Sequence, residues 1–78
     1  MSCFVFKERH KVELYDVRLL VECEFVAHSD SRVTVSVQKV FASLQGRADG
    51  PDISSLFAAS DKLLNELNEI LLNRHRSE

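Results

Sequence analysis

The spacing of apolar residues changes once along this 78-residue chain, and that change constrains the fold more than any other feature. Between residues 17 and 27, apolar side chains recur at every second position, which is typical of a β-strand with one buried face. From residue 53 onward they recur at every third or fourth position, the period of an amphipathic α-helix. The sequence therefore predicts an α+β fold in which a sheet precedes a helix.

The clearest predicted strand covers residues 17–27, with its odd-numbered side chains on the apolar face. Its even-numbered side chains form a mostly polar face, on which Leu20 and Val26 are the apolar exceptions. A polar loop at 28–31 separates this strand from a second alternating run at 32–38. The two runs together predict a β-hairpin.

Two shorter alternating runs, residues 2–7 and 12–15, precede this hairpin, and a charged segment between them predicts an interruption. We therefore expect an antiparallel β-meander of three to four strands within residues 1–44. After Val37 the alternation slips, and the following apolar residues fit either a strand with a β-bulge or a short helix. We favour the strand because residues 33–40 are rich in β-branched side chains.

Both glycines and the only proline of the chain fall between residues 45 and 51, so we interpret residues 45–52 as a linker. Asp52 suits a helix N-cap, because its carboxylate can accept hydrogen bonds from the amides of the first turn. Residues 53–75 are predicted to form one long amphipathic helix. Its apolar stripe is wider than a two-stranded coiled-coil seam, so we expect it to pack on one sheet face within a single domain, 1–78.

Composition and motifs argue against several classes of function. Ten Lys and Arg against twelve Asp and Glu give an even balance, with a formal net charge of −2. The sequence contains no CxxC, HExxH or phosphate-loop pattern, so we expect no catalytic residue, no metal, no cofactor and no enzymatic activity. We also expect no membrane insertion and a cytoplasmic or nuclear location, because the apolar runs are too short for a spanning helix or a signal peptide.

Two polar groups within the β-rich half are predicted to be structural. Cys23 lies on the apolar face of the strand at 17–27, so we expect it to act as a small buried hydrophobic residue. Residues 28–31 include a histidine, an aspartate and two serines. Neighbouring positions in one tight loop cannot face each other as catalytic triad members do, so we interpret this segment as a polar turn.

The small size of the chain predicts a partner. A domain of this length buries only about 60–65% of its unfolded surface, and two cysteines cannot supply a disulfide scaffold. We therefore expect a small non-enzymatic protein–protein interaction module, which is either a homodimer or an accessory subunit of a larger complex. It would associate through the apolar stripe of the C-terminal helix, an exposed strand edge, or both. The candidate partner-binding residues are Leu64, Leu67, Ile70, Leu71 and Leu72 on the helix, with Leu20 and Val26 on the sheet.

An alternative function is a nucleic-acid-binding accessory subunit that uses scattered basic residues. These residues are Lys7, Arg9, Lys11, Arg74 and Arg76. Because acidic residues are interleaved with them and the chain has no basic excess, we expect a protein partner rather than nucleic acid.

Overall fold

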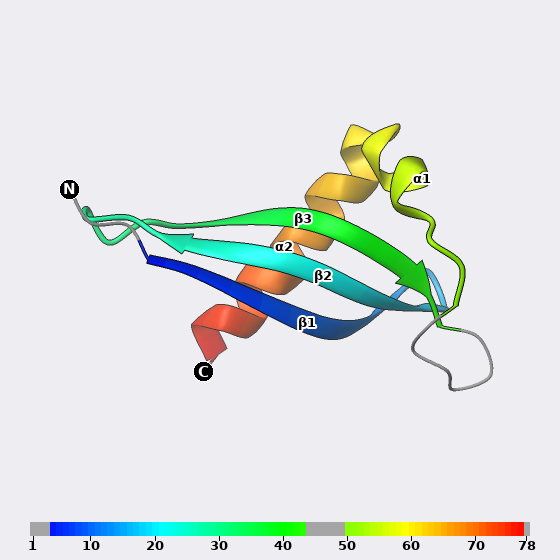
Figure 1. Cartoon of the computed structure of the whole chain (residues 1–78), viewed down its shortest axis with the longest axis horizontal. Helices are drawn as coiled ribbons and strands as arrows, with labels where there is room; N and C mark the ends of the chain where they lie inside the picture. Colours follow the sequence, from blue (N-terminus) through cyan, green and yellow to red (C-terminus); the bar gives the residue numbers. More distant parts are fainter. Residues whose placement is uncertain (1–3, 44–49, 78) are drawn as a thin grey trace.

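A computed structural model describes residues 4–43 and 50–77. The described residues form strands β1 (Phe4–Leu14), β2 (Val17–Ala27) and β3 (Val33–Ala42), followed by helices α1 (Ser54–Ala58) and α2 (Asp61–Ser77). The strands form an antiparallel sheet in the order β1-β2-β3, and α2 crosses one face of it (Figure 1). The predicted α+β meander followed by a C-terminal helix is therefore confirmed.

Strand β1 is continuous, so the interruption predicted at residues 7–11 was wrong. The basic residues Lys7 and Arg9 lie at alternate positions there, and each forms an ion pair with an acidic residue on β2. Lys7 Nζ lies 3.9 Å from Glu24 Oε1, and Arg9 Nη2 lies 3.2 Å from Glu22 Oε2. Opposite charges on neighbouring strands stabilise the extended conformation, so the charges did not mark a turn.

The turn between β1 and β2 contains only Tyr15 and Asp16, which have φ angles of 51° and 63°. Two successive residues with positive φ are the geometry of the tight hairpin turn whose twist matches the flanking strands. A bulky residue rarely adopts this conformation. Here the Tyr15 hydroxyl donates a hydrogen bond of 2.6 Å to Glu66 Oε1, which attaches the turn to α2.

A β-bulge on β3 explains why the alternation slips after Val37. Val37 lies opposite Cys23 and Lys39 lies opposite Glu22, so Gln38 is an extra residue on β3. The bulge returns the next apolar residue, Val40, to the buried face of the sheet. The favoured strand interpretation is confirmed as far as Ala42, and residues 44 and 45 lie outside the described part of the chain.

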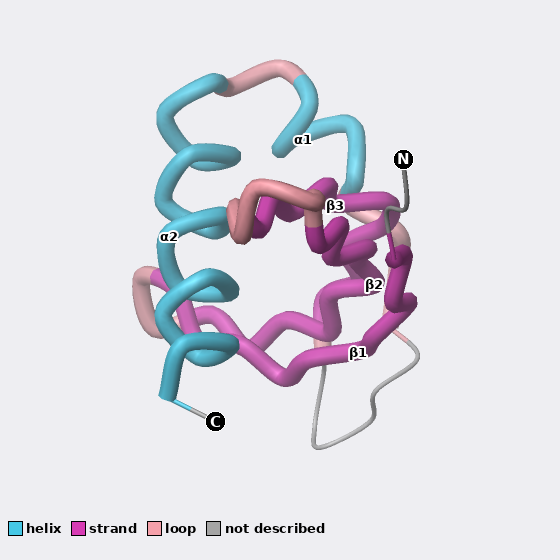
Figure 2. The backbone as a smooth tube through the Cα atoms, turned by 90° about the vertical axis from the view of Figure 1, so that its left-hand side faces the viewer, coloured by secondary structure: helices cyan, strands magenta, loops and turns pink. Residues whose placement is uncertain are grey.

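The core lies between the sheet and the two helices, which form a second layer on one side (Figure 2). Strand β2 contributes most of the sheet side of the core, because it is the central strand and both its neighbours cover its backbone. The buried residues are Val12, Leu19, Val21, Cys23, Phe25, Val40, Phe57, Leu67 and Leu71. The expected burial of Cys23 is therefore confirmed.

The predicted continuous helix over 53–75 was wrong between α1 and α2, where the chain bends at Ala59 and Ser60. Ser60 begins a new helix, because its Oγ accepts a hydrogen bond from the Leu63 amide at 3.3 Å. Its carbonyl oxygen accepts the first helical bond, from the Leu64 amide at 3.0 Å. The bend lets α1 pack against β3 through Phe57 while α2 crosses the sheet.

Residues 51–53 pair with the end of the outer edge of β3. The Ala42 amide donates to the Pro51 carbonyl at 2.9 Å, and the Ile53 amide donates to the Val40 carbonyl at 2.8 Å. The predicted N-cap role of Asp52 was wrong, because Ile53 occupies that position, but Asp52 does accept a hydrogen bond of 2.9 Å from the amide of Ser54 in the first turn. This end of β3 is therefore covered by the chain itself.

Candidate protein-interaction surfaces

The helix stripe is used mainly inside the chain. Leu67 and Leu71 are fully buried against the sheet, with no exposed surface. Ile70 and Leu72 are half-buried and pack against the same core, and Leu64 is also half-buried. The two most central candidate residues, Leu67 and Leu71, therefore have no surface that a partner could contact in the folded chain.

The two candidate residues on the outer sheet face lie at opposite ends of it. Leu20 pairs with Lys11 and Phe41, whereas Val26 pairs with Val5 and Thr34. Both are half-buried, and the Lys7–Glu24 and Arg9–Glu22 ion pairs lie between them. They do not form one continuous apolar patch.

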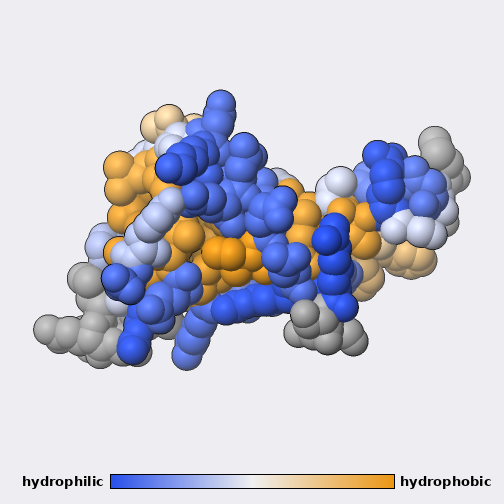
Figure 3. All heavy atoms as spheres, turned by 180° about the vertical axis from the view of Figure 1, so that it is seen from behind, coloured by the Kyte–Doolittle hydropathy of each residue, from blue (hydrophilic) through white to orange (hydrophobic). Residues whose placement is uncertain are grey.

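A third apolar surface lies at the end of the sheet that projects beyond the C-terminal end of α2 (Figure 1). Phe4, Val5 and Phe6 are 63%, 54% and 47% exposed, and the rings of Phe4 and Phe6 are stacked with centroids 6.5 Å apart. We call Phe4, Val5, Phe6 and the adjacent Val26 the apolar end. From the helix side, apolar side chains reach the surface along this projecting part (Figure 3).

Sequence reasoning missed Phe4 and Phe6 as surface residues. The signal was present, because residues 3–6 are apolar at every position rather than at alternate ones. Only the structure shows that α2 ends before it covers them.

The edge strand β1 carries three of the five basic candidate residues. Lys7, Arg9 and Lys11 occupy alternate positions, and Arg74 Nη1 donates a hydrogen bond of 2.5 Å to the Lys11 carbonyl oxygen. The structure thus brings four of the five basic candidates together. It places Arg76 elsewhere, in a groove beside the β2–β3 hairpin.

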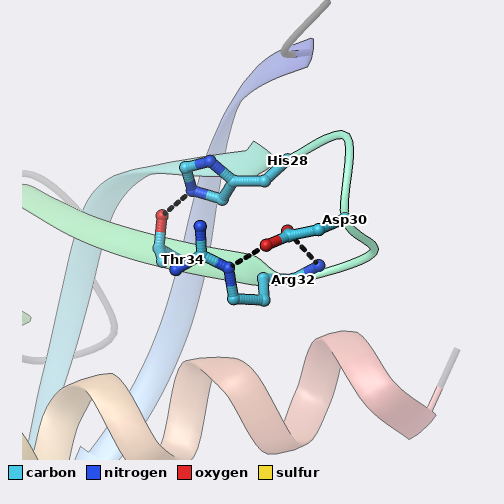
Figure 4. Close-up of polar contacts among 4 residues, drawn as sticks. All are labelled: His28, Asp30, Arg32 and Thr34. Carbon is cyan, nitrogen blue, oxygen red and sulfur yellow. Dashed lines mark hydrogen bonds and ion pairs between the residues drawn. The ribbon is translucent and has the colours of Figure 1, made fainter.

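The β2–β3 hairpin is held by two local contacts (Figure 4). Asp30 accepts a 2.7 Å bond from Arg32 Nε and a second from the Arg32 amide, and these bonds lower the pKa of its carboxyl group. His28 Nε2 and Thr34 Oγ1 lie 3.1 Å apart across the hairpin. Ser31 has a φ of 72°, which suits a three-residue hairpin loop. These contacts support the interpretation of residues 28–31 as a polar turn.

The outer edge of β3 differs from that of β1 in its charge. Residues 33–38 carry no charged side chain, and in the described part of the chain no strand pairs with them on the side away from β2. Residues 51–53 cover only the later part of β3, from Val40 to Ala42. We call residues 33–38 the open β3 edge.

Titratable groups near the core include Cys23, His10 and Glu8. Burial, and then the charge of Glu8, raise the pKa of the Cys23 thiol to about 11, so the thiol stays protonated at neutral pH. His10 Nε2 lies 2.7 Å from Glu8 Oε1, so the Glu8 carboxylate has a polar partner on its own strand. Among the described residues, no group of three or more His, Cys, Asp or Glu side chains could hold a metal ion.

Comparisons with protein-family models, with curated proteins and with solved structures found no match to this chain. Within residues 4–43 and 50–77, neither helix is long and apolar enough to cross a membrane.

Proposed function

We propose that this chain is a small protein–protein interaction module that binds another protein chain through its sheet. The observation that carries the proposal is the apolar end, where Phe4, Val5 and Phe6 lie exposed in an unbroken row on an edge strand. Isolated apolar residues are common on protein surfaces and need no explanation. A row of large apolar side chains on an edge strand is a feature of binding sites and of aggregation-prone surfaces.

The open strand edges support the same proposal. A partner that adds a strand to an exposed edge gains main-chain hydrogen bonds, and the adjacent side chains then provide specificity. In this proposal Leu67 and Leu71, which are fully buried, stabilise the core of the chain itself rather than contacting the partner. The partner is either a second copy of the chain or a subunit of a larger complex.

A nucleic-acid partner has less support. Lys7 and Arg9 face Glu24 and Glu22, so much of the positive charge on the outer row of β1 is balanced within the sheet. Unpaired basic groups bind nucleic acid by neutralising its phosphates and releasing the counterions held there, and this row offers few such groups.

The test compares two variants that remove exposed apolar side chains. Phe4→Ser/Phe6→Ser alters the apolar end, and Leu56→Ser removes a 60% exposed leucine on α1 as the matched control. The readouts are the sedimentation mass of the purified proteins and quantitative capture of binding proteins from a native extract. We expect the double variant to lose a binding protein that both the wild type and Leu56→Ser retain.

The proposal is overturned if the wild type is monomeric and captures no protein that depends on Phe4 and Phe6 or on the open β3 edge. Circular dichroism of each variant shows whether the fold is kept, so that a loss of binding is not confused with unfolding.

A further inference from the structure

We propose that the open β3 edge binds a second copy of this chain, so that two three-stranded sheets join into one six-stranded antiparallel sheet. This inference rests on the proposed function and names one partner for it. The two strands that meet are β3 and β3 of the second copy, related by a two-fold axis.

The backbone of the open β3 edge is oriented for pairing. The His28 amide donates to the Arg32 carbonyl at 2.8 Å, which begins the ladder between β2 and β3 with a hydrogen-bonded pair. Since hydrogen-bonded and non-hydrogen-bonded pairs alternate in an antiparallel ladder, Thr34 and Ser36 bond to β2. Val33, Val35 and Val37 therefore direct their amide and carbonyl groups away from β2, toward the open edge.

The chain itself shows that this edge accepts an antiparallel segment. Beyond the bulge, Val40 also directs its backbone outward, and it bonds to the Ile53 amide and to Ser54 Oγ, the latter at 2.9 Å. Phe41 and Asp52 form an antiparallel bridge at the same place. The open β3 edge continues this row of outward-facing groups toward the hairpin.

The two edges of the sheet differ in how they resist pairing. Charged side chains on an edge strand discourage a second strand from adding to it. The β1 edge has Lys7, Arg9 and Lys11 at alternate positions, and Arg74 bonds to its backbone. The open β3 edge has valine, threonine, serine and glutamine only, so it has no such protection.

A two-fold axis through Val35 makes this edge complementary to itself. In that register Val35 lies opposite Val35 of the second copy, and Val33 lies opposite its Val37, all on the helix side of the sheet. Thr34 lies opposite Ser36 of the second copy on the outer face. No charged residue opposes another across these five positions, and the β-branched side chains suit strand pairing.

A groove beside the hairpin adds side-chain contact area to the strand pairing. It is lined by Val33 and Thr34 from β3 and by Leu72 and Arg76 from α2. Val33 and Leu72 are both half-buried at the margin of the core. A second copy seated on the open β3 edge would cover this margin, which gives Leu72 the partner-facing position expected from the sequence.

The test uses charges whose effect depends on the register. Thr34→Lys/Ser36→Lys places lysine opposite lysine across the two-fold axis, and we expect it to weaken dimerisation at least about tenfold. Thr34→Glu/Ser36→Lys carries the same serine change but places glutamate opposite lysine across the axis, and it puts no second carboxylate beside Glu24, the partner of Ser36 on β2. We expect it to dimerise within about threefold of the wild type. Sedimentation equilibrium at micromolar concentrations gives the dissociation constants.

A cysteine cross-link tests the same register independently. Residues of a hydrogen-bonded pair have Cα atoms about 5.5 Å apart, a separation that a disulfide spans. We therefore expect Val35→Cys to form a covalent dimer under mild oxidation, in excess of the wild-type background. The matched control, Arg9→Cys on the β1 edge, should remain at that background.

The inference is overturned if the wild type is monomeric, if both lysine variants have the same mass, or if Val35→Cys and Arg9→Cys cross-link equally. A monomeric wild type that still binds another protein through Phe4 and Phe6 overturns this inference alone. The proposed function would then stand.

Discussion

Replacing Leu71 with alanine tests whether the helix stripe belongs to the core of a single chain. Leu71 has 0% exposure and lies between α2 and the sheet. The substitution removes three carbon atoms, worth about 0.8 kcal/mol each on transfer out of water, which gives about 2.4 kcal/mol. Incomplete collapse of the cavity adds to this, so we expect a loss of about 3 kcal/mol.

A loss of this size is a large part of the total stability, because a domain of this length has about 4–12 kcal/mol. The assay is urea unfolding followed by circular dichroism in the Thr34→Lys/Ser36→Lys background, where association does not contribute. The loss should be the same at low and high protein concentration. Leu56→Ala, on the exposed side of α1, should change the free energy of unfolding by less than about 0.5 kcal/mol.

A loss below about 1 kcal/mol for Leu71→Ala would refute the reasoning, since a fully buried leucine cannot be removed so easily from a packed core. A loss that grows with protein concentration would also refute it. That result would mean that the stripe is buried by another chain, as the sequence suggested.

Two further predictions concern single polar groups. Ser60→Ala should destabilise the fold by about 1 kcal/mol, because it removes the N-cap hydrogen bond of α2. The control Ser55→Ala, at an exposed position on α1, should change the free energy of unfolding little. Equal losses for the two variants in urea unfolding would contradict the role of Ser60 as the cap. Burial and the charge of Glu8 raise the pKa of the Cys23 thiol from 9.0 to about 11. Because the folded chain favours the protonated thiol, this group stabilises the fold fully below pH 9, and its contribution is lost as the pH rises toward 11. The free energy of unfolding should therefore fall more steeply over that range in the wild type than in Cys23→Ala, and equal slopes would contradict the pKa.

The strands and the final helix could be predicted because their apolar period is regular and each buries one face. The continuity of β1 could not, because a run of charged residues suits a turn as well as the solvent face of a strand, and only the structure shows Glu24 and Glu22 on β2 beside Lys7 and Arg9. The bend before α2 could not be predicted either, because Ser60 fits two roles. Ser60 occupies a position on the apolar stripe, so its spacing indicated a continuous helix although its hydroxyl group acts as a cap.

The interaction surfaces were harder to predict than the fold. Periodicity shows that the face with Leu67 and Leu71 is buried, but not whether a sheet or a partner covers it. The open β3 edge is also ambiguous in sequence, because a run of uncharged β-branched residues is typical of a central strand as well as of an edge. Only the strand order β1-β2-β3 shows that this run lies at a margin of the sheet.

Amide hydrogen exchange along β3 tests the pairing of two copies most directly. The backbone amides at positions 34 and 36 should be protected in the wild type and in both variants, because they bond to β2 whichever side chain is present. Val33, Val35 and Val37 should be protected in the wild type and in Thr34→Glu/Ser36→Lys, but should exchange rapidly in Thr34→Lys/Ser36→Lys. Equal exchange of the three valine amides in all of these proteins would contradict a dimer built on the open β3 edge.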